Sequence, residues 1–249
     1  MPRRIEMVSG SPTVRSNSAD VHPPCPVPDG PWKRCPMRNV VTDQSVDRRY
    51  APVVPELLTS GDPELRPVAD PEFAWKCVGP VAAPELAVER RRMRELIDTR
   101  PQPLERSERP GHFTGSALVV HADLERTLVL FHAKLQIWVQ PGGHADGNAN
   151  LPAVALQEAE EETGIEGLHI WPVAVDLDIH WVEPPGEEAH EHFDVRFVVL
   201  APQGARIRGN HESEAQRWVR PEELAGLGAD AGLQRLAANG LALARSIRS

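Results

Sequence analysis

The sequence predicts an α/β fold with a helical extension at its N-terminal end. Segments with strand-like alternation occur between residues 116 and 219, and a glycine-rich loop among them runs into an amphipathic helix. A further helical pattern covers residues 230–247. At 249 residues the chain is long enough for one well-packed domain and an extension.

Composition narrows the classes of function. The net charge is −9, from 36 acidic and 27 basic residues, so a nucleic acid is not expected as a partner. No apolar run reaches the length of a membrane span, and the three cysteines show no metal-binding spacing. We therefore expect a cytoplasmic protein that binds no membrane.

The first 110 residues divide into a tail and an extension. Residues 1–50 are rich in Pro, Ser, Arg and Asp without a sustained period, which predicts disorder. Residues 51–110 are expected to form a helical cap or dimerisation arm, with helices at 53–58 and 83–97 and a closing linker. The arginines of the second helix are expected to be solvated, with contact to a substrate phosphate as the less favoured alternative. The domain proper is then residues 111–249.

Strands are predicted on both sides of the glycine loop. Before it they cover residues 116–121, 127–132 and 134–139, and after it residues 168–181, 192–201 and 215–219. In the segment 192–201, period 2 places His192, Asp194 and Arg196 on one face and apolar residues on the other. The polar face indicates either the wall of a pocket or an exposed sheet face, and alternation alone leaves both open.

The stretch from Pro141 to Ile165 contains the glycine loop and the helix, and residues at both ends of this helix mark its bounds. Asn150 suits the N-cap, Pro152 suits the first turn, and Gly164 suits the position that ends a helix. We therefore expect a helix over residues 151–163.

Glutamates follow one side of this helix. At about 100° per residue, Glu158, Glu161 and Glu162 share an arc with apolar residues, whereas Glu160 points the opposite way, to solvent. An arc that is partly apolar must pack, so the three carboxylates face the body of the protein and need positive charge. Oxygen ligands favour Mg²⁺ or Mn²⁺ over zinc. A helix held by salt bridges is the less favoured alternative.

This stretch resembles the Nudix box, G-x5-E-x7-R-E-U-x-E-E-x-G-U, in which U is aliphatic. The residues in register are Gly143, Glu158, Glu161, Glu162, Gly164 and Ile165. Ala149 stands where the box has its first glutamate, and Gln157 stands where it has an arginine. Asp146 is a candidate substitute for the glutamate, and Gln157 can donate a hydrogen bond but supplies no charge. The Pro-Gly-Gly-His loop further resembles one bacterial Nudix subgroup.

The resemblance implies an α/β/α sandwich with a mixed sheet, and hydrolysis of a nucleoside diphosphate linked to another moiety (NDP-X). The implied ligands of Mg²⁺ (or Mn²⁺) are Gly143, Glu158, Glu161 and Glu162. The catalytic candidates are Glu158, Glu161, Glu162 and Glu212, with Glu214 as a rival to Glu212. Substrate contacts are expected from Lys134, His144, His192, Asp194 and Arg196. The expected partner is a small phosphorylated molecule, and a homodimer is left open.

Three other interpretations remain. A Nudix-fold protein that binds a nucleotide or sugar nucleotide without cleaving it is favoured by Ala149 and Gln157. An enzyme similar to the isopentenyl diphosphate isomerases is disfavoured, because no suitable cysteine lies in the domain. A structural or interaction protein requires the inward glutamates to be paired with arginines.

Overall fold

The computed structural model describes residues 55–81, 83–132, 136–184, 186–209 and 213–248. These residues belong to one compact unit, which spans Pro52–Ser249. The expected disordered tail, 1–50, and two expected site residues, Lys134 and Glu212, lie outside the described residues. The side chain of Glu214 is likewise not described.

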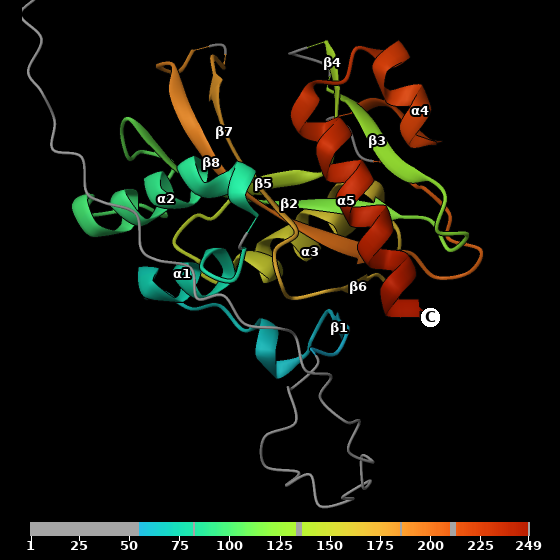
Figure 1. The fold of residues 1–249 in the computed structure, drawn as a ribbon, viewed down its shortest axis with the longest axis horizontal. Coiled ribbons are helices and arrows are strands. Elements are labelled where there is room, and N and C mark those ends of the chain that lie inside the picture. The colour runs from blue at the N-terminus through green and yellow to red at the C-terminus, as the bar shows by residue number, and fades with distance from the viewer. Residues whose placement is uncertain (1–54, 82, 133–135, 185, 210–212, 249) are drawn as a thin grey trace, which may run out of the picture. The chain divides into compact units, whose positions relative to one another are not determined.

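A mixed β-sheet forms the centre of this unit (Figure 1). Its strands are β1 (Leu58–Thr59), β2 (Gly111–Val120), β3 (Thr127–His132), β4 (Ile137–Val139), β5 (Gly142–His144), β6 (His169–Ile170), β7 (Asp176–Val182), β8 (His190–Leu200) and β9 (Ser213–Val219). The main path is β1-β6-β8-β2-β3-β4, with β5 paired to β2, β7 to β8 and β9 to β3. The long pair of β2 and β8 is parallel and the other pairs are antiparallel, so the sheet is mixed as predicted.

Helices cover both faces of the sheet. They are α1 (Pro71–Val78), α2 (Ala87–Thr99), α3 (Leu151–Thr163), α4 (Pro221–Leu224) and α5 (Ala231–Arg248). One hydrophobic cluster joins α1, α2 and α3 to the face of β2 and β8 that carries Phe113 and Phe193. A second cluster joins α5 to the face that carries Leu118 and Val198. This arrangement is the expected α/β/α sandwich. Within the described ranges, no helix combines the length and the apolar character needed to cross a membrane.

Helix α3 has the predicted bounds, and its two ends differ in how they are held. Gly164 ends the helix in the left-handed conformation, with φ of 65°, as expected for a terminal glycine. Asn150 occupies the N-cap position but makes no side-chain capping bond. Its amide instead donates to the carbonyl oxygens of Glu64 and Arg66, at 2.8 and 2.9 Å. The prediction of the N-cap position was therefore right, although the Asn150 side chain is used to bind the extension.

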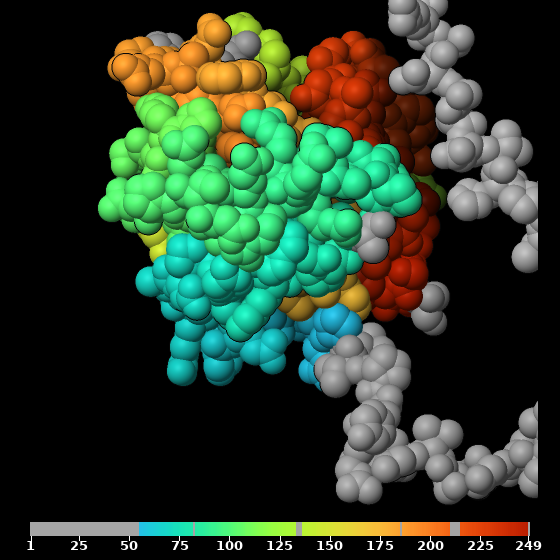
Figure 2. Space-filling view, turned by 60° about the vertical axis from the view of Figure 1, so that its left-hand side comes forward, coloured from blue at the N-terminus to red at the C-terminus, as the bar shows by residue number. Residues whose placement is uncertain are grey.

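The extension packs into the same unit as the domain. In Figure 2 the segments of α1 and α2 form one continuous surface with the loop that follows them. The predicted helix at 53–58 is wrong in its described part, since Leu58 pairs with Ile170 as the edge strand β1. The predicted helix at 83–97 corresponds to a 3₁₀ turn followed by α2.

Arginines of α2 contact the protein itself. Arg92 pairs with Glu191 at 2.7 Å, Arg94 pairs with Glu72 at 2.6 Å, and Arg90 donates to the carbonyl of Val81 at 2.8 Å. These contacts hold α2 to β8, to α1 and to the segment before α2. The three arginines are therefore engaged within the protein rather than free to bind a substrate phosphate.

Candidate active site and histidine cluster

The glutamates of α3 meet the glycine loop at β5. The carboxylate of Glu158 lies directly against Gly143, so closely that a Cβ atom at this position would overlap it. The backbone N–H of Gly142 donates to Oε2 of Glu162 at 3.1 Å. Both glutamates are half-buried. Glu158 and Glu162 therefore face the body of the protein as predicted, and glycine at 143 is required by close approach.

The other two glutamates depart from the helical projection. Glu161 is exposed, and its Oε1 accepts a hydrogen bond of 2.9 Å from Nε2 of Gln157. Glu160 is half-buried, and burial raises the pKa of its carboxyl group. The expectation that Glu160 is the solvated member was therefore wrong. A helical projection takes no account of the extension. Ser60 of the extension reaches this side of α3, and its hydroxyl bonds Glu160.

The position of the missing first glutamate is buried, and its backbone is bonded to the extension. Ala149 is fully buried, and its N–H donates to the carbonyl of Val68 at 2.6 Å. The N–H of Val68 in turn donates to Oδ1 of Asn148 at 3.0 Å. The proposed substitute, Asp146, is exposed and forms an ion pair with Arg106, which also lowers the pKa of its carboxyl group. Asp146 is thus already neutralised by a neighbour.

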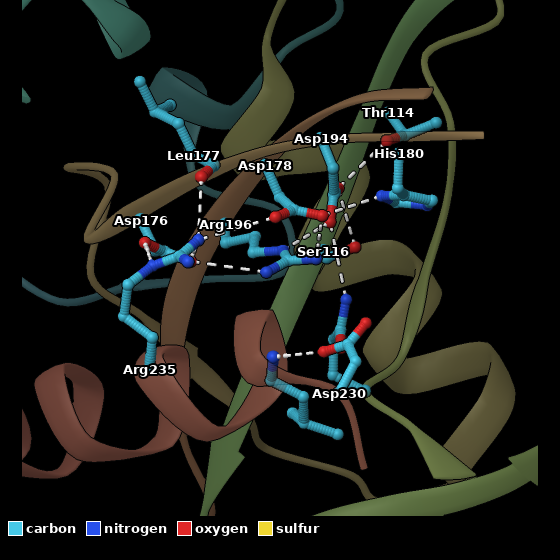
Figure 3. Close-up of polar contacts among 12 residues, drawn as sticks. Thr114, Ser116, Asp176, Leu177, Asp178, His180, Asp194, Arg196, Asp230 and Arg235 are labelled. Carbon is cyan, nitrogen blue, oxygen red and sulfur yellow. Dashed lines mark hydrogen bonds and ion pairs between the residues drawn. The ribbon is translucent and has the colours of Figure 1, made fainter. Parts of the chain in front are cut away.

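A continuous polar surface follows the even-numbered residues from 112 to 116 of β2 and from 190 to 196 of β8, on the face opposite α3. Register pairs Thr114 with Asp194 and Ser116 with Arg196. Oδ1 of Asp194 accepts hydrogen bonds from the hydroxyls of Thr114 and Ser116, at 2.9 and 2.8 Å (Figure 3). Asp194 and Arg196 are 1% and 2% exposed. The predicted polar face is real, and at these two residues it is neither an exposed sheet face nor an open pocket wall.

Arg196 is the centre of a buried ion-pair network with α5 lying over it. Its guanidinium contacts Asp194, Asp178 and Asp176, at 2.7, 3.0 and 3.3 Å. Arg235 of α5 adds a bond of 2.8 Å to Asp176, and Figure 3 shows this side chain reaching the strands from the helix. Burial by itself lowers the pKa of Arg196, but the carboxylates around it outweigh burial and raise the pKa. Asp194 and Arg196 are therefore engaged inside the protein and present no open surface to a substrate.

Four histidines meet at the end of this polar surface that precedes Thr114 and Asp194 along β2 and β8. They are His112 of β2, His144 of β5, and His190 and His192 of β8. One ligand nitrogen from each lies within 4.8 Å of the others. Burial and the neighbouring imidazoles lower the pKa of His112 to about 4 and that of His192 to about 2, so both rings are neutral at pH 7.

The sequence had indicated only part of this cluster. His144 and His192 were expected in the site and His190 lies two residues from His192, but the role of His112 was missed. The register of β2 and β8, which places His112 beside His192, is the missing information. A fifth histidine, His180, contacts the His192 ring but is held by Asp178 at 2.9 Å.

The fold is thus a mixed sheet between helices, and in the site a glycine loop lies against a glutamate-bearing helix. The family model described as the NUDIX domain matches residues 113–238, which is just over half of the chain. The chain therefore belongs to the Nudix family. Nudix hydrolases act on acid anhydrides and generally use divalent metals, so membership of this family supports a pyrophosphohydrolase.

Solved structures of the family resemble the chain at low identity. A C. elegans Ap4A hydrolase in a binary complex is 17% identical over 54% of this chain and 98% of its own, with a TM-score of 0.45. A NUDIX family hydrolase from Clostridium perfringens is 20% identical over 53% and 97%, also with a TM-score of 0.45. The E. coli dihydroneopterin triphosphate pyrophosphohydrolase is 20% identical over 52% and 92%, with a TM-score of 0.41. A comparison with curated proteins gave no significant match.

Proposed function

We propose that the protein hydrolyses a pyrophosphate linkage in a nucleoside diphosphate derivative (NDP-X) by attack of water, with Mg²⁺ or Mn²⁺ as the metal. The observation that carries this proposal is the contact between α3 and β5. Glu158 lies against Gly143, and Glu162 accepts a hydrogen bond from Gly142. Two carboxylates thus converge on two consecutive residues of the loop, and Glu161 follows on the same helix.

The donor set fits a hard divalent cation. Carboxylate and carbonyl oxygens are the ligands that Mg²⁺ and Mn²⁺ prefer, and the site offers Glu158, Glu161, Glu162 and the carbonyl of Gly143. Among the described residues, these carboxylates do not form a compact group like that of the histidines. When bound, such ions neutralise phosphate charge and lower the pKa of a water molecule.

Each residue then has a role. Glu161 and Glu162 bind metal, and the Gln157 amide orients Glu161 through the bond of 2.9 Å. Glu158 binds metal or takes a proton from the attacking water, with Glu212 as the alternative base. Lys134 remains the proposed contact for substrate phosphate. Asp194 and Arg196 have a structural role, because their network of hydrogen bonds and ion pairs joins β2, β7 and β8.

The test is a panel of nucleoside diphosphate derivatives, assayed for release of phosphate and nucleoside monophosphate with Mg²⁺ or Mn²⁺. We expect turnover that requires the metal and disappears in Glu161→Gln. The matched control is Glu160→Gln, which removes the same charge from the neighbouring position of α3. Equal turnover in the parent and in Glu161→Gln would contradict the assignment of the site.

A second candidate is a protein that binds such a ligand without cleaving it. The observation in its favour is Ala149 itself, a buried residue that supplies no carboxylate where the box has a glutamate. Under this alternative, ligands of the panel would raise the melting temperature while the parent protein released no product at saturating metal.

A further inference from the structure

We propose that His112, His144, His190 and His192 form a second metal centre, which binds one Zn²⁺ ion through four imidazole nitrogens. This centre is separate in its ligands from the carboxylate site on α3. The proposal does not depend on hydrolysis of NDP-X, since it rests on the histidines alone.

Unpaired nitrogens are the first observation. Both ring nitrogens of His112 and the Nε2 atoms of His190 and His192 are buried and have no hydrogen-bond partner among the described residues. A buried polar atom without a partner costs roughly 1–3 kcal/mol. Such a cluster calls for a group that the protein itself does not supply, and a cation bound by lone pairs satisfies one nitrogen each of His112, His190 and His192.

The orientation of the rings is the second observation. Nδ1 of His190 lies 2.7 Å from the carbonyl oxygen of Glu188, which can only accept, so Nδ1 carries the proton and Nε2 presents a lone pair to the cluster. A backbone carbonyl behind a histidine ligand is the usual outer support of a metal site. The rings of His112 and its three neighbours lie 5.0 to 5.2 Å apart between centroids.

The spacing is close to that of a loaded site. Ligand nitrogens within 4.8 Å of one another must approach to roughly 3.3 Å around a tetrahedral zinc with Zn–N bonds of about 2.0 Å. The backbone already brings the histidines together on paired strands, so we expect side-chain rotation to complete this approach. His112 is the register partner of His192, and β5 is paired to the same strand, β2.

The ligand type selects the metal. An all-imidazole set contains no carboxylate for Mg²⁺ and no thiolate, and imidazole suits Zn²⁺ and its neighbours in the first transition row. Four protein ligands complete a tetrahedral shell and leave no position for water, so the centre is structural. It ties His144, which directly follows Gly143, to β2 and β8, and thereby fixes the loop on which the α3 glutamates rest.

The first experiment measures metal content. The protein is produced without a polyhistidine tag, stripped with a chelator and titrated with Zn²⁺ in the presence of excess Mg²⁺, which keeps the carboxylate site occupied. We expect about one tightly bound Zn²⁺ per chain and a rise in melting temperature on binding. Absence of tight Zn²⁺ binding in the parent protein would overturn the proposal.

Variants then locate the ion. The double variant His144→Gln/His192→Gln is expected to lower Zn²⁺ affinity at least about 100-fold. His169→Gln, in a histidine outside the cluster, and Glu161→Gln, in the carboxylate site, should keep the parent's Zn²⁺ affinity. Loss in Glu161→Gln with retention in the double variant would place the ion on α3 and overturn the proposal.

A spectroscopic measurement on the parent protein covers the case in which the double variant fails to fold. Co²⁺ in place of Zn²⁺ reports geometry, since a four-coordinate nitrogen site absorbs strongly in the visible range and an oxygen-bound six-coordinate site absorbs weakly. Strong absorption that Mg²⁺ does not displace supports the histidine centre. Weak absorption, or displacement by Mg²⁺, contradicts it.

Discussion

The side-chain amide of Gln157 donates a hydrogen bond of 2.9 Å to Oε1 of Glu161, one turn further along α3. The Nudix box has an arginine at this position, and the bond shows that a neutral side chain still reaches the metal-binding glutamate proposed here. A neutral donor bonds a carboxylate less strongly than a charged one does.

Changing Gln157 should therefore move activity in both directions. Gln157→Leu removes a bond worth about 1 kcal/mol, which corresponds to about a fivefold loss of kcat/KM. Gln157→Arg restores a charged donor and should raise kcat/KM by a similar factor. Steady-state kinetics at saturating Mg²⁺ measure both effects. If neither variant differs from the parent, the bond has no part in catalysis.

Neutralising the proposed metal ligands should abolish turnover without unfolding the protein. Glu162→Gln keeps the shape that accepts the Gly142 N–H but loses its charge, so we expect kcat/KM to fall about 100-fold or more. Glu160→Gln should stay within about twofold of the parent. Thermal unfolding of each variant separates a catalytic loss from a folding defect, and a loss of equal size in both variants would argue against a specific role.

Restoring the first glutamate of the box should harm this protein. Ala149→Glu places a carboxylate at a fully buried position, so we expect a loss of several kcal/mol in the free energy of unfolding and no gain in kcat. Chemical denaturation and kinetics test this together. A folded Ala149→Glu protein with higher kcat would contradict this expectation.

Removing the buried guanidinium should be among the most damaging changes. Arg196→Met leaves the carboxylates of Asp176, Asp178 and Asp194 without their central partner, and we expect a loss of about 3–5 kcal/mol. Arg235→Met should cost clearly less, because Arg235 is part-exposed and Arg196 remains. Urea denaturation gives both values, and the reverse order would contradict the central place of Arg196.

The same network predicts a loss of stability in acid. Burial raises the pKa of Asp178, but the hydrogen bond with His180 and the charge of Arg196 outweigh burial and lower the pKa to about 2. Because the pKa is lower in the folded state, the contribution is present above the unfolded value of about 4 and is lost as pH falls toward 2. The contribution is on the order of 2 kcal/mol. Asp178→Asn should be less stable at pH 7 and should lose less between pH 4 and pH 2.

Local sequence rules predicted α3 and the faces of β8. Proline in the first turn, glycine after the last and the period of the apolar residues are short-range signals, so the bounds of α3 agree with the structure. The alternation of β8 is of the same kind, and its polar residues do share one face.

Features that depend on distant segments were not predictable in this way. The strand β1 forms by pairing of Leu58 with Ile170 at the sheet edge. Glu160 is half-buried on a side of α3 where Ser60 of the extension bonds it. The histidine cluster requires the parallel pairing of β2 with β8, whose partners are 80 residues apart at Thr114 and Asp194. No local pattern encodes that register.

The contacts of residues 64–68 limit how far the protein can be truncated from its N-terminal side. The family match begins at residue 113, yet Val68, Glu64 and Arg66 supply the partners of Asn148, Ala149 and Asn150 at the entrance to α3. A fragment cut at the family boundary would expose these groups and the apolar surface beneath α1 to water. The smallest fragment that we expect to fold alone is thus larger than the region that the family model matches.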